Sequence, residues 1–214
     1  LLQEHGGAPT PKAAVTEWGI ILGGDGWHEA PNHDTQSGAV YAGLFYNAMM
    51  RAAEVVGLGN VTALMHGGCI QKHRGIVNVT PMIHVQRMYG SARPQRLVPI
   101  SVSGPAYEVP RRGLLPAVKD VPWVDVVVGE GKGRWVACMV NRDPSRGRDV
   151  ELTFPWSIAG ASAEALAADP RAGNDLEHPD RVAPTPLAVQ TDGKEMRVRL
   201  PAACVCIVSV HQRR

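Results

Sequence analysis

The sequence predicts a mixed fold, in which two βα units are followed by an antiparallel β-sandwich. Residues 12–90 alternate short apolar runs with helical patterns, whereas residues 97–214 hold many short strand-like runs between turns. The chain has 23 Gly and 17 Pro among 214 residues, which argues against helical bundles and coiled coils. With 44% apolar and 20% charged residues, a packed core is expected rather than disorder.

The first βα unit begins with residues 12–18 (KAAVTEW), a short apolar run that predicts a buried strand. A glycine-rich loop follows over residues 19–37, and loops of that length in compact domains are usually functional. Apolar residues at i, i+4 spacing then predict a helix over residues 37–56, with Ser37 as its N-cap and two glycines just after it.

The second unit is predicted as a strand over residues 60–65, a loop over residues 66–75 and a helix from Thr80-Pro81 to Gly90. Two βα units cannot form an independent parallel sheet with both faces covered. They are therefore expected to be a portion of a larger α/β body.

The remaining sequence predicts the sandwich. Residues 129–133 (GEGKG) lack the GK[ST] of a phosphate loop and no helix follows them, so they are predicted to be a hairpin turn. Residues 159–168 are assigned as a short helical turn. The predicted strands are residues 97–102, 123–128, 135–141, 149–154, 196–200 and 203–210.

Charge and cysteine content exclude several classes of function. The net charge is +2 and basic residues are dispersed, so there is no footprint for nucleic acid or an anionic membrane. No apolar run approaches the roughly 18 residues that span a bilayer. The four cysteines lack zinc spacing and are expected to be buried, reduced thiols.

Glu17 is the first candidate catalytic residue, because it ends a predicted strand just before a long loop. In a (β/α) barrel the catalytic groups lie at the C-terminal ends of the strands. A carboxylate there can attack an anomeric carbon, and Trp18 beside it offers a flat apolar face to a sugar. The alternative is an ordinary surface glutamate.

The loop over residues 19–37 adds Trp27 and His28 as candidate substrate-binding residues, with Trp27 as a stacking platform. A metal site is disfavoured, because His28 and His33 are five residues apart and no HExxH motif occurs. No metal is expected.

The second loop adds His66 and Gln71, and Asn78 follows it. Adjacent barrel strands would place these polar groups beside the Glu17 loop, where they can bond sugar hydroxyls. A solvated loop without a ligand is the alternative.

Five stretches in order carry a family resemblance: residues 14–18 (AVTEW), 39–65, 76–90, 136–152 (VACMVNRDPSRGRDVEL) and 174–184 (NDLEHPDRVAP). The chain resembles the C-terminal half of glycoside hydrolase family 51 enzymes, the α-L-arabinofuranosidases. The resemblance implies that residues 1–92 are the last two βα units of a (β/α)8 TIM barrel. Residues 93–214 would be a jelly-roll-like accessory sandwich.

The resemblance also implies a retaining mechanism that releases terminal α-L-arabinofuranosyl residues from arabinoxylan, arabinan or arabino-oligosaccharides. Glu17 falls on the position of the nucleophile. The acid/base glutamate of the family follows an asparagine on the fourth barrel strand, which would precede Lys12. No cofactor and no metal is implied, and homo-oligomers are common in the family.

The chain also departs from the family pattern. The nucleophile motif often has Asp before the Glu and Asn after the Trp, where this chain has Thr16 and Gly19. A glutamine of the late barrel loop has no clear counterpart near Asn78. Because the chain begins with Leu1, we expect a fragment or processed subunit that requires the remainder of the barrel and is inactive alone.

Two other functions stay open. A related glycosidase acting on β-glucan or xylan would use Glu17 equally well. A non-catalytic carbohydrate-binding or structural β module would account for residues 97–214 but would leave Glu17 without a purpose. A cytoplasmic location fits the unpaired cysteines, and secretion stays open.

Overall fold

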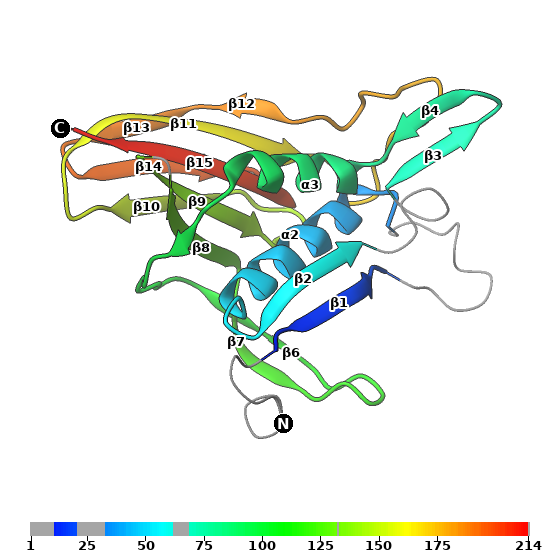
Figure 1. Cartoon of the computed structure of the whole chain (residues 1–214), viewed down its shortest axis with the longest axis horizontal. Coiled ribbons are helices and arrows are strands. Elements are labelled where there is room, and N and C mark those ends of the chain that lie inside the picture. Colours follow the sequence, from blue (N-terminus) through cyan, green and yellow to red (C-terminus); the bar gives the residue numbers. More distant parts are fainter. Residues whose placement is uncertain (1–10, 21–32, 62–68, 132, 214) are drawn as a thin grey trace.

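The computed structural model describes residues 11–20, 33–61, 69–131 and 133–213 (Figure 1). Strands dominate this part of the chain, and its two helices lie in the N-terminal half. In chain order the elements are β1 (Ala13–Trp18), α2 (Gln36–Arg51), β2 (Val56–Val61), β3 (Ile70–His73), β4 (Ile76–Val79), α3 (Pro81–Ala92), β5 (Arg96–Leu97), β6 (Ala106–Val109), β7 (Val118–Pro122), β8 (Val124–Gly131), β9 (Arg134–Asn141), β10 (Arg148–Thr153), β11 (Ile158–Ala167), β12 (Thr185–Leu187), β13 (Val189–Asp192), β14 (Glu195–Leu200) and β15 (Cys204–Gln212).

β1 and β2 form a two-stranded parallel sheet, connected through α2. The predicted helix of residues 37–56 ends five residues early, and β2 starts four residues before the predicted strand. Gly57 and Gly59 therefore belong to β2 rather than to the end of a helix. A Cβ on Gly59 would lie 2.3 Å from the Met49 sulfur, so glycine lets α2 pack closely on the strand.

Residues 70–75 were predicted as part of a loop and residues 76–79 were assigned to no element, but residues 70–79 form the hairpin β3–β4. Arg74 and Gly75 both have positive φ, 48° and 86°, as a two-residue hairpin turn with right-handed strand twist requires. The second predicted helix is confirmed as α3, with Pro81 in its first turn. It passes Gly90 and ends at Ala92, and the following C-cap residue Arg93 is left-handed at φ 41°.

The antiparallel sandwich is confirmed. One sheet has the order β12-β11-β15-β9-β8-β5 and the other has the order β10-β14-β13. The helical turn predicted over residues 159–168 is wrong, because this alanine-rich segment is β11 and pairs with most of β15. The strand predicted over residues 97–102 shrinks to β5, and the hairpin β6–β7 was not predicted.

The six-stranded sheet is covered on both faces. Successive residues of its strands point to opposite sides, so Val127 and Cys138 pack under α2 and α3 while Val126 and Ala137 face the three-stranded sheet. Cys204 and Cys206 both face the second core, as their two-residue spacing predicts. All four cysteines are free and buried, in agreement with the sequence prediction.

A buried polar network joins the helices to the sandwich. Asp125 on β8 accepts hydrogen bonds from Asn47 (2.6 Å) and Arg51 (2.9 Å) of α2, and Arg142 bonds its other oxygen at 2.8 Å. Tyr89 of α3 donates to Asn47 at 2.7 Å. Within the described residues, no helix has the length and apolar character needed to cross a membrane.

Candidate functional site

Glu17 lies one residue before the C-terminal end of β1, and its side chain is exposed. Val15 and Trp18 both pack toward the helices, which strict alternation along a strand forbids for residues three apart. The β1–β2 register is irregular between these two residues, and bulges of this kind re-aim side chains. The irregularity leaves Thr16 and Glu17 on the open side of the sheet.

Trp18 lies on the other side of β1 from Glu17 and is only 6% exposed. Its ring stacks on Phe45 with centroids 4.6 Å apart, and Tyr46 contacts it edge-on at 5.1 Å. These contacts favour a packing role for Trp18. The stacking of a sugar ring on Trp18 stays a prediction.

Gln71 and Asn78, which the sequence predicted as binding residues, lie together on the β3–β4 hairpin. They are a directly paired position of the ladder, and the Asn78 side-chain amide donates to the side-chain oxygen Oε1 of Gln71 at 3.2 Å. Gln71 in turn donates to Asp34 at 2.8 Å, just before α2. Asp34 also lies 3.4 Å from the ring of His33. The hairpin and the start of α2 therefore share one polar cluster.

Asn174, in the connection from β11 to β12, anchors this cluster and was not predicted as a site residue. Its amide donates to the carbonyls of Val79 and Val182, each at 3.0 Å, and its oxygen accepts from the Val182 NH at 2.7 Å. Its own carbonyl accepts from Asn78 at 3.1 Å. The sandwich thus holds the hairpin in place. The only signal in the sequence was its position in the late stretch of residues 174–184.

Three of the predicted binding residues, Trp27, His28 and His66, lie outside the described residues. His33 is 4% exposed. Across residues 11–20, 33–61, 69–131 and 133–213 there is no group of three metal-ligating side chains. The C-terminal ends of β1 and β2 and the β3–β4 hairpin lie on the same side of the molecule, at right in Figure 1.

The cysteine and tyrosine near this side are poor nucleophiles at neutral pH. Burial, and to a smaller degree the charge of Asp34, raise the pKa of Cys69 to about 11. Burial also raises the pKa of Tyr41, whose hydroxyl donates to the Gly19 carbonyl at 3.3 Å. Both groups stay protonated, so an exposed carboxylate such as Glu17 is the better candidate.

Comparison with protein families decides the relationship. Residues 16–204 match the family model of the alpha-L-arabinofuranosidase C-terminal domain. The chain belongs to this family. The resemblance to the C-terminal half of glycoside hydrolase family 51 enzymes is thereby confirmed. No curated protein matches the chain.

Solved structures of arabinofuranosidases share the fold. The family 51 enzyme of Xanthomonas axonopodis pv. citri is 22% identical (TM-score 0.76), and 94% of this chain covers 41% of that enzyme. The Thermotoga maritima enzyme, solved as an arabinose complex, is 17% identical with a TM-score of 0.78, and the match covers 93% of this chain and 43% of that enzyme. The Thermotoga petrophila RKU-1 enzyme is 18% identical with a TM-score of 0.79, and the match covers 94% of this chain and 43% of that enzyme. The chain therefore spans less than half the length of these enzymes.

Proposed function

We propose that this chain is the C-terminal part of a retaining glycoside hydrolase that releases terminal α-L-arabinofuranosyl residues from arabinoxylan, arabinan or arabino-oligosaccharides, with Glu17 as nucleophile. The observation that carries the proposal is the exposed carboxylate at the C-terminal end of a parallel strand. Catalytic groups of (β/α) barrels occupy this position. Family membership and the names of the similar structures support the arabinofuranoside as substrate.

In the proposed mechanism, the Glu17 carboxylate attacks the anomeric carbon and forms a glycosyl ester while the aglycone leaves. A second carboxylic acid, about 5–5.5 Å away, protonates the leaving oxygen and then removes a proton from the water that cleaves the ester. We assign that acid to the remainder of the barrel. The Gln71 and Asn78 amides have the chemistry to bond sugar hydroxyls from the neighbouring hairpin.

The open side of the β1–β2 sheet supports a partner that completes the barrel. Leu58 of β2 is 49% exposed, and parallel sheets are almost always covered on both faces. On the hairpin, Ile76 and Val77 are 55% and 57% exposed. We propose that further parallel strands pair with β1 and β2. The 214-residue chain alone is then expected to be inactive.

The test uses the longer polypeptide, or this chain combined with the missing barrel segment, and nitrophenyl α-L-arabinofuranoside as substrate. Glu17→Gln is expected to lower kcat at least 10³-fold, since the ester cannot form. Glu17→Ala with added azide should give an arabinofuranosyl azide of inverted configuration. Glu54→Gln, an exposed carboxylate after α2, is the matched control and should keep full activity. Substantial turnover by Glu17→Gln would refute the assignment.

A further inference from the structure

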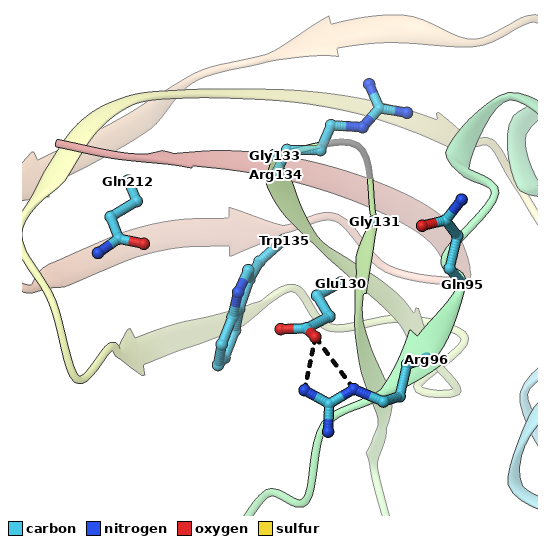
Figure 2. A pocket seen from close by; sticks show the side chains of 8 residues that line it. All are labelled: Gln95, Arg96, Glu130, Gly131, Gly133, Arg134, Trp135 and Gln212. Atoms are coloured by element: carbon cyan, nitrogen blue, oxygen red, sulfur yellow. Dashed lines mark hydrogen bonds and ion pairs between the residues drawn. The ribbon is translucent and has the colours of Figure 1, made fainter. Parts of the chain in front are cut away.

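A concave feature lies at one end of the sandwich. It is a cleft of about 490 Å³, and its side-chain lining includes Gln95, Arg96, Glu130, Arg134, Trp135 and Gln212 (Figure 2). It adjoins the C-terminal end of β15, at left in Figure 1, whereas β1 ends at right. The Glu17 chemistry therefore does not account for it.

Strand register explains why these side chains converge. Trp135 of β9 pairs with Glu130 of β8 on one side and with Val210 of β15 on the other. Gln212 lies two residues beyond Val210, so it shares the face of the sheet with Trp135 and Glu130. Figure 2 shows Trp135 and Glu130 side by side, between Gln212 and Arg96.

The indole of Trp135 is held by other aromatic rings. Trp156 meets it edge-on with centroids 5.4 Å apart, and Phe154 does so at 6.0 Å. Phe154 is buried, while Trp135 is half-buried and lines the cleft. Edge-to-face packing of this kind fixes the orientation of the ring. The cleft thus has a preformed aromatic wall.

Two of the three charged side chains at the cleft, Arg96 and Glu130, compensate one another. Arg96 donates to one oxygen of Glu130 from two nitrogens, at 2.5 and 3.0 Å. Arg134 points away from the other side chains in Figure 2, and it donates hydrogen bonds to the carbonyls of Ser91 at 3.0 Å and Ala92 at 3.1 Å. What faces the cleft is an indole, two exposed glutamines and a neutralised ion pair. Arg134 is the one lining cation among the described residues without an acidic partner, and its side chain points away, so the lining favours a neutral ligand over an anion.

We propose that this cleft binds a short neutral oligosaccharide. The C–H face of a sugar ring packs on an aromatic surface such as Trp135, and convergent polar groups fix the orientation of a ligand. The side-chain amides of Gln95 and Gln212 each supply a hydrogen-bond donor and an acceptor, which neighbouring hydroxyl groups of a sugar require. The proposal stands on the cleft alone and does not depend on Glu17 being the nucleophile.

The test is isothermal titration calorimetry, with saturation-transfer NMR, on the 214-residue chain with arabinotriose and xylotriose as probes. At least one probe should bind saturably. Gln212→Ala and Trp135→Phe should each weaken binding at least fivefold. The matched control Gln190→Ala, an exposed glutamine on β13, and Glu17→Gln should bind like the wild type. Inorganic phosphate should not compete.

Circular dichroism and thermal melting will verify that each variant is folded, and Gln212 is exposed, so its truncation leaves the core intact. The absence of saturable binding of both probes by the folded wild type would overturn the proposal. Unchanged binding by both cleft variants would do the same. If sedimentation shows a dimer that Trp135→Phe dissociates, without sugar binding, the cleft is a contact between copies instead.

Discussion

The six-stranded sheet and the β1–β2 pair show two different degrees of completion. Helices cover one face of the six-stranded sheet and the three-stranded sheet covers the other, so its central side chains are almost fully buried. Helix α2 covers one side of the β1–β2 pair, and residues such as Thr16, Glu17 and Leu58 stay exposed on the strands. The contrast teaches that both faces of the large sheet are buried within this chain, whereas one face of the parallel pair stays exposed.

Truncating leucine in each region should give the largest difference. Leu166→Ala, at a fully buried site between the sheet and the helices, should cost about 2–5 kcal/mol of unfolding free energy, from lost transfer energy and the remaining cavity. Leu58→Ala, 49% exposed on β2, should change it by less than about 0.5 kcal/mol. Urea denaturation of the 214-residue chain measures both. Equal losses would mean that β2 is covered in solution.

The link between the two regions is the next target. Asn174→Ala removes three hydrogen bonds to Val79 and Val182. Leaving buried backbone groups unpaired should cost about 1–3 kcal/mol. Hydrogen exchange should increase at β3–β4 while β9 and β15 keep their protection. Asn60→Ala, exposed on β2, is the control. Unchanged hairpin exchange in the Asn174 variant would show that the sandwich does not position the hairpin.

Two helical glycines test how tightly the helices pack on the sheet. A Cβ on Gly43 would lie 2.9 Å from Val140 and 3.0 Å from Val205, so Gly43→Ala should destabilise by about 1–2 kcal/mol despite its better helix propensity. Gly90 of α3 has open space around its position, so Gly90→Ala should stabilise by about 0.5–1 kcal/mol. Thermal denaturation of the wild type and of the two variants under the same conditions measures both changes in stability. If Gly43→Ala stabilised the protein, the contact between α2 and the six-stranded sheet would have room for an added methyl group.

The smallest expected effect concerns Asp143 in the β9–β10 turn. Burial raises the pKa of Asp143, but hydrogen bonds from the Ser145 NH, Arg148 and the Arg146 NH outweigh it and lower the pKa below its ordinary value. Ionised Asp143 therefore contributes fully to the free energy of unfolding above about pH 5, and this contribution is lost as the pH falls below about 4.

Asp143→Asn should cost about 1 kcal/mol at pH 7, where the charged hydrogen bonds are lost. The difference from the wild type should shrink between pH 5 and pH 3, since protonation removes the same interaction from the wild type. Asp149→Asn, whose ion pair with Arg199 is exposed, is the control with little change. A difference that stays constant with pH would contradict the role of this carboxylate.

Periodicity and turn residues predicted much of the fold. The apolar run ending in Glu17, the helical spacing before Arg51 and the alternation of Met196, Val198 and Leu200 each led to an observed element. The segment of residues 159–168 misled, because its alanine, leucine and glutamate residues favour helix locally and only the long pairing with β15 makes the segment a strand. The β3–β4 hairpin was missed because its turn residues, Arg74 and Gly75, are not a typical hairpin pair.

By itself, the sequence determined several of the helices and strands and the candidate carboxylate, since these depend on local pattern and on residue type. Only the tertiary structure decided that Trp18 packs on Phe45, that Asn174 holds the hairpin, and that Trp135 and Gln212 share a cleft. Those relations join residues far apart in the chain. Strand register and helix packing set them, and neither is encoded in any short stretch of residues.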